Sequence, residues 1–356
     1  KKKFNAKINV KFGNKITCSF GATIKQHGKM SDHIGISKGN LFQSVDVDLK
    51  NGHINGITKF VLFRPGTRKN PEDEIFLTEL LRKLNFLAPR TNFVDVKLNN
   101  LTTRMLFQEQ AEKELLEYNS RKEGPILEGD ERYFSLAQER FDSKQARNSF
   151  GKISKRSLLA RQTNSQWSLR GAPYQNISFE ALTQLNLFYL ITKNVYGDPK
   201  NSHVIYNINL DNNLLAPKNP IQISKLNTYN AILFAANGYQ GLVPGNRKFY
   251  WNSINKYFEP IYYDGKLAID ETFFKPLNFE LVSFPEKNIF LQGIKKAKKS
   301  IEQIKTDSLF KEVKLKGSEL SNIEVKNKLK KIFKKLSKLE IQVKDNIEKE
   351  LKSNVN

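Results

Sequence analysis

An asparagine and an aspartate at the two ends of one segment are the residues of this sequence best suited to metal chemistry. The segment is "NRKFYWNSINKYFEPIYYDG" (246–265), in which two aromatic-rich runs flank a polar centre. We expect antiparallel strands over 247–251 and 257–263, whose pairing would bring Asn246 and Asp264 side by side at the open end of the hairpin. An amide oxygen beside a carboxylate offers hard oxygen ligands of the kind that Mg²⁺ prefers. Polar residues also end hairpins that have no function beyond folding, so this interpretation stays open beside the metal site.

The elements that must position this pair follow from the periodicity of the chain. Residues 1–63 have the alternation of β-strands, separated by Gly and Asn turn signals. A helix with a proline and three acids at its start is expected over 72–86, and two strands, 92–100 and 102–110, follow it. Beyond these strands the pattern becomes mainly helical, with a strong amphipathic helix over 177–197.

The C-terminal residues 295–356 form a separate block with 18 Lys against 9 acids. We expect a helix there that packs back on the rest of the chain, self-associates, or presents a basic surface to an anionic partner. Its apolar residues step by four and three, as in a coiled-coil seam. They are Val325, Leu329, Ile332, Leu336, Leu339 and Val343, with Ile347 and Leu351 extending the stripe.

The formal net charge of +23 suggests a polyanionic partner. However, nearly all of the excess is Lys in a chain that is also rich in Asn and Ile, as an AT-rich genome would produce. No zinc finger or RNP signature is present, so a nucleic acid is the least favoured partner.

Cysteine, histidine and apolar runs exclude other classes. Cys18 is the single cysteine, which rules out an internal disulfide, and the four histidines show no HxxxH or HExxH spacing for zinc. No apolar run approaches the roughly 18–20 residues of a membrane-spanning helix, so no transmembrane segment is expected.

Three segments resemble the spore coat protein H (CotH) kinase family, which comprises bacterial, atypical protein-kinase-like proteins. The segments are a helix with an acidic start followed by "APR" (88–90), the strand end "FQEQ" (107–110), and the hairpin that ends in "EPIYYDG" (259–265). The resemblance covers roughly residues 40–265, which is most of the chain.

This resemblance implies an α+β fold of the two-lobed, atypical protein-kinase-like type. Residues 1–110 would form an N-terminal lobe built on an antiparallel sheet, and residues 111–294 a mainly helical C-terminal lobe. Residues 295–356 would be a Lys-rich helical tail.

The resemblance also implies roles for particular residues, with ATP and Mg²⁺ as cofactors. Asp264, with the glycine after it, resembles the metal-binding Asp-Gly of kinases, and Asn246 resembles the catalytic-loop asparagine that holds a second Mg²⁺. Glu74 resembles the acid that orients a phosphate-binding base, and Gln108 and Glu109 resemble the hinge that contacts adenine. Such parts suffice because phosphoryl transfer is mainly positioning and charge neutralisation.

The sequence departs from the family pattern at the phosphate-binding lysine. The strand that resembles the family's lysine-bearing strand is "SVDVDL" (44–49), which offers two aspartates instead. A cation could come from Lys50, Lys59 or Arg64, and we favour Arg64 because it lies between a strand and the helix that carries Glu74.

A second departure concerns the catalytic base. Family members often place a His or Asp a few residues before the metal-binding asparagine, whereas this chain has Gln240, Val243 and Gly245 before Asn246. Phosphoryl transfer does not depend heavily on such a base. The missing base therefore weakens the inference of kinase activity but does not exclude that activity.

Three other segments carry weaker signals. "GDPKNSH" (197–203) has an aspartate and a histidine in what is best interpreted as a loop. "EGDE" (128–131) could bind a cation, although an exposed acidic turn is the favoured interpretation. Trp167 and Arg170 could stack on a ligand or pack within the protein.

The leading hypothesis is an ATP- and Mg²⁺-dependent, CotH-like phosphotransferase that acts on a protein or a surface polymer. The alternative is a catalytically inactive kinase-like binding or scaffold protein that engages an anionic partner. A cell-envelope or spore-surface setting follows from the family resemblance alone.

Overall fold

The computed structural model describes residues 2–13, 16–28, 33–37, 40–98, 101–130, 132, 159–191, 213–243, 245–272 and 284–353. The chain divides into two compact units. The first comprises Lys1–Glu123 and Thr306–Val325, and the second comprises Gly124–Lys305 and Lys326–Asn356. These units are defined by compactness, and the domain boundaries expected from the sequence remain predictions.

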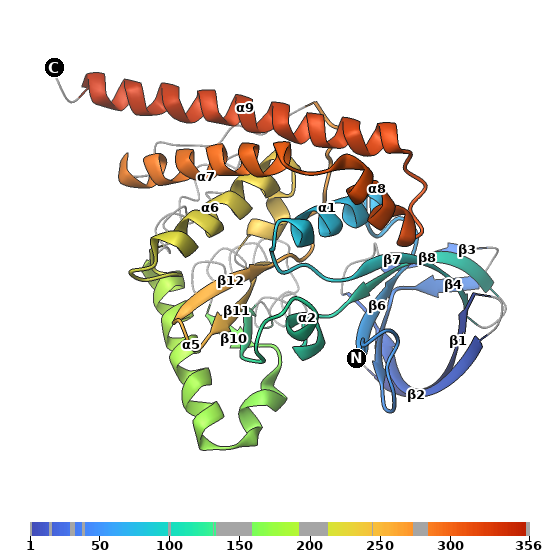
Figure 1. The fold of residues 1–356 in the computed structure, drawn as a ribbon. Helices are drawn as coiled ribbons and strands as arrows, with labels where there is room; N and C mark the ends of the chain where they lie inside the picture. Colours follow the sequence, from blue (N-terminus) through green and yellow to red (C-terminus); the bar gives the residue numbers. More distant parts are fainter. Residues whose placement is uncertain are drawn as a thin grey trace, which may run out of the picture. The chain divides into compact units, whose positions relative to one another are not determined.

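The first unit is built on a curled, six-stranded antiparallel sheet (Figure 1). Its strands, in spatial order, are β1 (Lys3–Phe12), β2 (Ile16–Gln26), β5 (Val45–Leu49), β6 (Lys59–Phe63), β8 (Leu101–Glu109) and β7 (Thr91–Leu98). A separate two-stranded ribbon consists of β3 (Ile34–Ser37) and β4 (Asn40–Gln43). The strands predicted over 92–100 and 102–110 are confirmed as the antiparallel pair β7–β8.

One face of this sheet is apolar because alternate residues of its strands point to the same side. Val47 and Phe60 are buried there, and the Phe60 ring stacks on the Phe107 ring with centroids 4.4 Å apart. The predicted N-terminal sheet with one major helix is therefore present in this unit.

The major helix of the first unit, α1 (Pro71–Lys83), begins as its sequence predicts. Proline occupies the first turn together with three acids, which suit the positive end of the helix dipole. Most residues of this helix are buried, including Ile75, Phe76, Leu77, Leu80 and Leu81.

Two shorter helices complete the first unit, α2 (Lys113–Tyr118) and α8 (Thr306–Leu315). The helix α8 belongs to the C-terminal block 295–356, which composition sets apart, and it contacts α1. Lys83 Nζ donates to Ser308 Oγ at 2.9 Å, and the carboxylate of Glu72 accepts from Ser318 Oγ and, at 3.1 Å, from the amide of Glu319.

The second unit contains a four-stranded sheet and most of the helices. In spatial order the strands are β10 (Ala160–Gln162), β9 (Ile126–Gly129), β11 (Lys248–Asn252) and β12 (Tyr257–Ile261). The helices are η2 (Ser165–Arg170), α5 (Ala172–Ile191), α6 (Pro220–Ala235), η4 (Tyr239–Leu242), α7 (Phe284–Glu302) and α9, which is Asn322–Ser353 and belongs to this unit from Lys326 onward. Leu185, Phe188, Phe249, Trp251 and Phe258 meet in its core.

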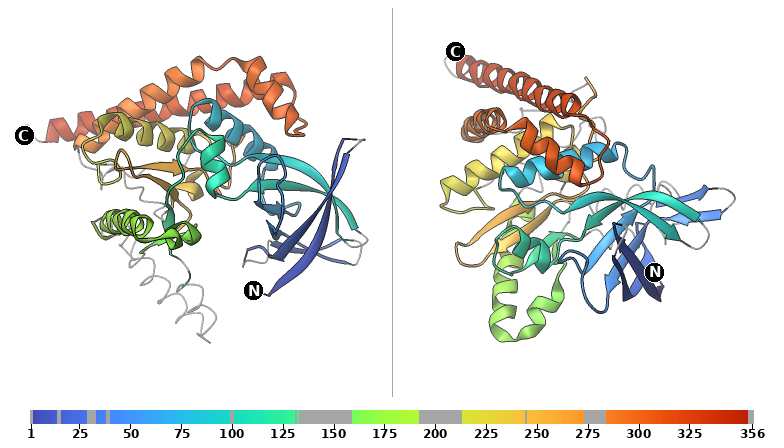
Figure 2. Two further views of the ribbon diagram at one scale, coloured as in Figure 1. Left: turned by 60° about the horizontal axis from the view of Figure 1, so that its bottom comes forward. Right: turned by 45° about the vertical axis from the view of Figure 1, so that its right-hand side comes forward.

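The helices α7 and α9 lie side by side in the second unit (Figure 2). Lys298 of α7 donates to Glu340 of α9 at 2.9 Å, and Lys287 donates to Glu350 at 2.6 Å. The stripe predicted from the four-three spacing is buried within the chain, with five of its six residues fully enclosed. The expectation that the Lys-rich helix packs back on the chain is therefore confirmed, and self-association through it would have to use another face.

No helix among the described residues combines the length and the apolarity needed to cross a membrane.

Candidate functional site

The two predicted metal ligands flank one hairpin, with Asn246 two residues before β11 and Asp264 three residues after β12. In the register of β11 and β12, Lys248 pairs with Ile261 and Asn252 pairs with Tyr257. Continuing this register past the strand ends would place Asn246 opposite Tyr263, one residue from Asp264. The strands are shifted by one or two residues from the predicted bounds, and the "NSINK" turn lies where the sequence indicates.

Asp264 lies in a strained turn. Its φ is +42°, and Lys266 two residues later has a φ of +51°. A positive φ is uncommon for residues other than glycine, with aspartate among those that tolerate it best, and surrounding structure helps to hold it. Gly241 of η4 supplies part of that structure, since a Cβ at this position would lie 3.0 Å from the carbonyl oxygen of Tyr263.

The amide of Gln240 lies against the carboxylate of Asp264, with 3.2 Å between Nε2 and Oδ2. Gln240 is one of the residues that stand where a kinase base was sought in the sequence. The structure therefore brings this position to the predicted metal ligand, with a neutral amide in place of an acid or imidazole.

The end of α6 is tied to the segment after Asp264. Asn237 adopts a left-handed conformation with φ +55°, as C-terminal cap residues often do. Its side-chain amide donates to the carbonyl oxygen of Ala268 at 2.9 Å, and the amide of Ala268 donates to Ala236 at 3.3 Å. In addition, the amide of Gly265 donates to the Tyr262 hydroxyl at 3.3 Å.

Asn246 lies in a tight turn that its neighbour anchors. The amides of Asn246 and Arg247 both donate to the carbonyl oxygen of Val243 at 2.9 Å. The guanidinium of Arg247 is buried, donates to Asn230 Oδ1 of α6 at 3.0 Å, and lies 4.8 Å from the centre of the Phe249 ring. The position of Asn246 is thus set by a buried cation rather than by the hairpin alone.

The chemistry of these side chains fits magnesium. Asp264 and Asn246 offer a carboxylate and an amide oxygen, and Mg²⁺ typically takes one or two protein carboxylates and fills its shell with phosphate and water. Within the described ranges, no three His, Cys, Asp or Glu side chains gather closely enough to hold a metal without such a partner. A bound Mg²⁺ would supply charge neutralisation on phosphate oxygens.

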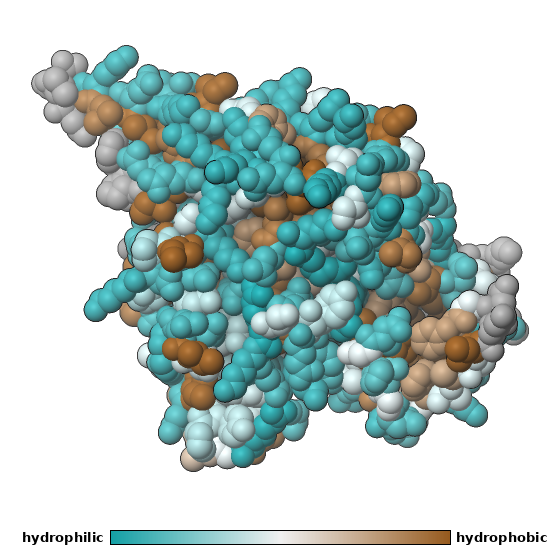
Figure 3. Space-filling model, in the orientation of Figure 1, coloured by the Kyte–Doolittle hydropathy of each residue, from teal (hydrophilic) through white to brown (hydrophobic). Residues whose placement is uncertain are grey.

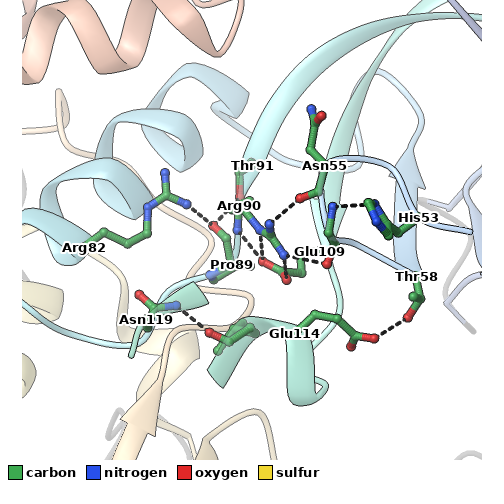
Figure 4. A network of polar contacts seen from close by, with 12 residues as sticks. His53, Asn55, Thr58, Arg82, Pro89, Arg90, Thr91, Glu109, Glu114 and Asn119 are labelled. Atoms are coloured by element: carbon green, nitrogen blue, oxygen red, sulfur yellow. Dashed lines mark hydrogen bonds and ion pairs between the residues drawn. The ribbon is translucent and has the colours of Figure 1, made fainter. Parts of the chain in front are cut away.

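In the first unit, two of the segments that resemble the CotH family meet in one ion pair (Figure 4). Arg90 of "APR" donates to Glu109 of "FQEQ" from Nε at 2.9 Å, from Nη2 at 2.5 Å and from its backbone amide at 3.1 Å. Both side chains are buried. Arg90 also donates to the carbonyl oxygen of Asn55 at 2.7 Å and lies 4.4 Å from the centre of the Tyr118 ring.

This pair bears on the role expected of Glu109 at a nucleotide hinge. Its carboxylate accepts three hydrogen bonds from Arg90, and its amide donates to the carbonyl oxygen of Arg90 at 3.0 Å. A contact between this carboxylate and a nucleotide would require Arg90 to move. The neighbouring Gln108 is buried within the sheet and donates to Thr91 Oγ1 at 3.3 Å.

Lys59 lies at the start of β6 among carboxylates. Its ammonium donates to Glu112 at 2.9 Å, and the Thr58 hydroxyl donates to Glu114 at 2.8 Å. Burial by itself would lower the pKa of Lys59, but the charge and hydrogen bond of Glu112 and two further carboxylates raise it. Burial in turn raises the pKa of Glu112, against the opposing effect of Lys59. An acidic cluster of this kind disfavours an approaching phosphate.

The remaining candidates of the first unit lie directly after β6 and in the first turn of α1. Arg64 directly follows β6, where its amide donates to Ser44 Oγ at 3.1 Å and its guanidinium to the carbonyl oxygen of Pro65 at 2.7 Å. Glu74 is buried in the first turn of α1, and its carbonyl oxygen accepts from Thr78 Oγ1 at 2.8 Å. The pairing of Arg64 with Glu74 stays a prediction.

The strand that carries aspartates in place of the family lysine is β5. Asp46 accepts from Gln110 Nε2 at 2.9 Å, is 2.7 Å from His27 Nδ1, and forms a 3.5 Å ion pair with Lys25. This aspartate therefore joins β2 and β5 to the end of β8.

The weaker sequence candidates have structural roles where the structure describes them. Glu128 is buried and forms ion pairs with Arg161 and Lys248, so the exposed acidic turn expected at this residue is wrong. Trp167 is buried and packs edge-on against Tyr174, with ring centroids 5.0 Å apart. Residues 197–203 lie outside the described residues.

Several residues that shape the candidate sites escaped the sequence reasoning. Arg90 and Arg247 are buried cations. The sequence marks Gln240 only as a residue that lacks the acid–base chemistry of a kinase base. The available signal was their position, since each lies inside or beside a segment that resembles the CotH family. Periodicity could not identify their partners, which lie 17 to 24 residues away.

Comparisons with known proteins do not assign a family. No protein-family model matches the sequence, and no curated protein matches it either. Among solved structures, the chain is similar to a chain in the complex of HipA, HipB and operator DNA from the toxin–antitoxin system of Shewanella oneidensis MR-1. That match has 11% identity and a TM-score of 0.37, and it covers 94% of this chain and 63% of the other. Such a score does not establish a shared fold, and the resemblance to the CotH family stays a prediction.

Proposed function

We propose that this chain is a CotH-like kinase, a phosphotransferase that uses ATP and Mg²⁺ and acts on a protein or a surface polymer. Asp264 and Asn246 would hold the metal, and Glu74 would orient Arg64 toward phosphate. The observation that carries the proposal is the Asp264 turn, a left-handed backbone at the open end of the hairpin that carries Asn246.

The second unit supports the metal-binding part of this proposal. Strained, non-glycine backbone conformations cluster at functional sites, because there the surrounding structure can enforce them. Here η4 and the end of α6 both bond to the loop that contains Asp264. A loop held in this way can present a carboxylate in one orientation, which phosphoryl transfer requires.

The first unit supports Arg64 over Lys59 as the phosphate-binding cation. Lys59 is held by Glu112 within a group of carboxylates, whereas Arg64 follows the strand and precedes the helix that carries Glu74. Gln108 and Glu109 would contribute to a nucleotide hinge only through the segment that they fix, since Arg90 occupies the carboxylate of Glu109.

The test is thermal unfolding of the wild type with ATP, with Mg²⁺, and with both. We expect a rise in the midpoint that needs both ligands together, because bound ligand stabilises the folded state by mass action. Asp264→Asn, which keeps the shape of the side chain and removes its charge, should abolish the Mg²⁺-dependent part. Transfer of labelled phosphate would then establish turnover.

A matched control is Asp345→Asn, which removes the charge of an exposed carboxylate on α9. It should keep the wild-type response to ATP and Mg²⁺. If neither ATP alone nor ATP with Mg²⁺ changes the thermal unfolding midpoint of the wild type, the kinase proposal is wrong. If Asp264→Asn keeps the full response, Asp264 does not belong to the site.

A second candidate function, binding without catalysis, is favoured by a row of lysines on α9. Lys326, Lys330, Lys334 and Lys338 are exposed, and none of them forms an ion pair with a residue that the structure describes. Their spacing of four residues places successive Cα atoms about 6 Å apart along one face of the helix. The surface along α9 is mostly hydrophilic (Figure 3). Such a row complements a linear polyanion.

Retention on a phosphate-bearing matrix tests this second function. Changing the four lysines of the row to Gln should lower the salt concentration at which the protein elutes, because screened ionic contacts are lost. Deleting α9 is no substitute, since its apolar stripe belongs to the core. The control removes the same charge from exposed strand positions, as in Lys3→Gln, Lys7→Gln, Lys11→Gln and Lys97→Gln. Equal losses in both variants would show a response to net charge rather than to the row.

A further inference from the structure

A buried lysine of α9 reaches the backbone that follows the Asp264 turn. The Lys335 residue is only 7% exposed, and its ammonium donates to the carbonyl oxygen of Ile269 at 2.9 Å and of Ala268 at 3.4 Å. Burying an ammonium is unfavourable unless it is hydrogen-bonded. These carbonyl oxygens are therefore among the groups that compensate the burial of the Lys335 ammonium.

Two more lysines of α9 hold the next residue of the same segment. Lys328 and Lys331 donate to the carboxylate of Asp270 at 2.6 Å and 2.8 Å. Positions 328, 331 and 335 follow the helical repeat, so the three side chains leave one face of α9. This face binds three consecutive residues, 268–270.

The segment 268–270 is also bonded to the end of α6. The carbonyl oxygen of Ala268 accepts from Asn237 Nδ2 at 2.9 Å as well as from Lys335, so two donors converge on one acceptor. Between Tyr262 and Ala268 the backbone passes through the left-handed residues Asp264 and Lys266. Such conformations persist where the surrounding structure enforces them, and the segment that follows is bonded to both α6 and α9.

We propose that α9 positions the Asp264 loop, with Lys335 as the positioning residue that sets the affinity of Asp264 for a divalent cation. This inference rests on the proposed function for its metal, and on the hydrogen bonds alone for its anchoring. Lys335 acts through the backbone that begins four residues after Asp264, at Ala268 and Ile269. Groups that orient a metal ligand from outside typically change metal affinity 10- to 100-fold when they are removed.

The experiment compares Lys335→Met with Lys335→Arg and with Lys349→Met. Methionine keeps an apolar stem and removes the ammonium, arginine keeps the charge, and Lys349 is an exposed lysine of the same helix outside the lysine row. The first measurement is amide hydrogen exchange over residues 262–270 without nucleotide. The second is the Mg²⁺ concentration that gives half of the ATP-dependent rise in the unfolding midpoint.

In Lys335→Met we expect faster exchange over 262–270 and a Mg²⁺ midpoint raised about tenfold. Lys335→Arg should recover part of both effects, and Lys349→Met should match the wild type. If Lys335→Met does not fold, Asp270→Asn loosens the same anchor while leaving Lys335 and its partners in place, and it should shift both measurements in the same direction by less.

The outcomes separate this inference from the proposed function. A wild type that does not respond to ATP and Mg²⁺ overturns the proposed function and the metal part of this inference, while exchange still decides whether Lys335 anchors the loop. Unchanged exchange over 262–270 in Lys335→Met overturns the anchoring. Faster exchange with an unchanged Mg²⁺ midpoint overturns the link between the anchor and the metal.

Discussion

The two groups of candidate residues are held in opposite ways. In the first unit, Glu109 is buried and bonded three times to the guanidinium and amide of Arg90. In the second unit, the carboxylate of Asp264 accepts from the neutral amide of Gln240. The backbone around Asp264 adopts left-handed conformations at residues 264 and 266. The first arrangement commits a carboxylate to a buried cation, and the second fixes the backbone that carries a carboxylate.

This difference separates structural from functional carboxylates in this molecule. A buried acid with a bidentate arginine partner is committed to that partner, because removing either leaves an uncompensated charge. Asp264, by contrast, lies in a segment whose backbone is bonded to α6 and α9, so its orientation is set through the main chain. We therefore place the chemistry at Asp264 and the folding role at Glu109, although both lie in segments that resemble one family.

The largest expected effect comes from breaking the neutralised pair in the first unit. Arg90→Met leaves the carboxylate of Glu109 buried without its partner, which should lower the free energy of unfolding by about 3–5 kcal/mol. The double variant Arg90→Met, Glu109→Leu should recover much of this loss, because no buried charge remains. Urea unfolding followed by far-ultraviolet circular dichroism measures both.

The control for this prediction is an arginine–glutamate pair in the same unit that is exposed. The side chains of Arg104 and Glu319 are 42% and 76% exposed, and Arg104→Met should cost less than about 1 kcal/mol. Equal losses for Arg90→Met and Arg104→Met would remove the distinction between the buried pair and an ordinary surface pair.

The next effect is expected at the turn that orients Asp264. Gly241→Ala would place a Cβ 3.0 Å from the carbonyl oxygen of Tyr263, so the loop must shift, at a cost of about 1–3 kcal/mol. We expect lower stability together with a weaker Mg²⁺-dependent response to ATP. Both tryptophans, Trp167 and Trp251, lie in the second unit, so their fluorescence follows its unfolding.

Gly21→Ala is the matched control, since its Cβ would meet only the flexible side chain of Asn51, at 3.2 Å. It should leave the response to ATP and Mg²⁺ intact. A Gly241→Ala variant with the wild-type response would show that the close approach of η4 does not orient Asp264.

The sequence predicts the local elements of this comparison but not their partners. Alternation predicts the β7–β8 pair, and the aromatic runs around "NSINK" predict the hairpin to within two residues. The family resemblance marks "APR" and "FQEQ" as separate signals, whereas they are two halves of one ion pair. Composition presents 295–356 as one tail, yet α8 returns to α1 and α9 anchors the Asp264 loop. Each of these contacts joins distant residues, and no local pattern encodes which distant residue is chosen.

A smaller effect should follow from turning the amide beside Asp264 into a carboxylate. Gln240→Glu puts a like charge where the amide now lies 3.2 Å from Oδ2, which should cost about 1 kcal/mol at low salt. Millimolar Mg²⁺ should reverse that loss, because two carboxylates bind a divalent cation better than one. Thermal midpoints with and without Mg²⁺ measure this, and Gln240→Ala should show no reversal. A Gln240→Glu variant indifferent to Mg²⁺ would argue against a cation at this turn.

The smallest effect concerns acid stability at the anchor of the Asp264 loop. Burial raises the pKa of Asp270, but the hydrogen bonds and charges of Lys328 and Lys331 outweigh it, so the pKa lies below its ordinary value of 3.8. Because the folded value is depressed, the stability that this group contributes is present above pH 3.8 and is lost as the pH falls through the folded value. Asp270→Asn should therefore flatten the dependence of the thermal midpoint on pH in that acid range. Asp345→Asn should leave the dependence unchanged, and the same slope in Asp270→Asn as in the wild type would mean that the two lysines do not hold this carboxylate in solution.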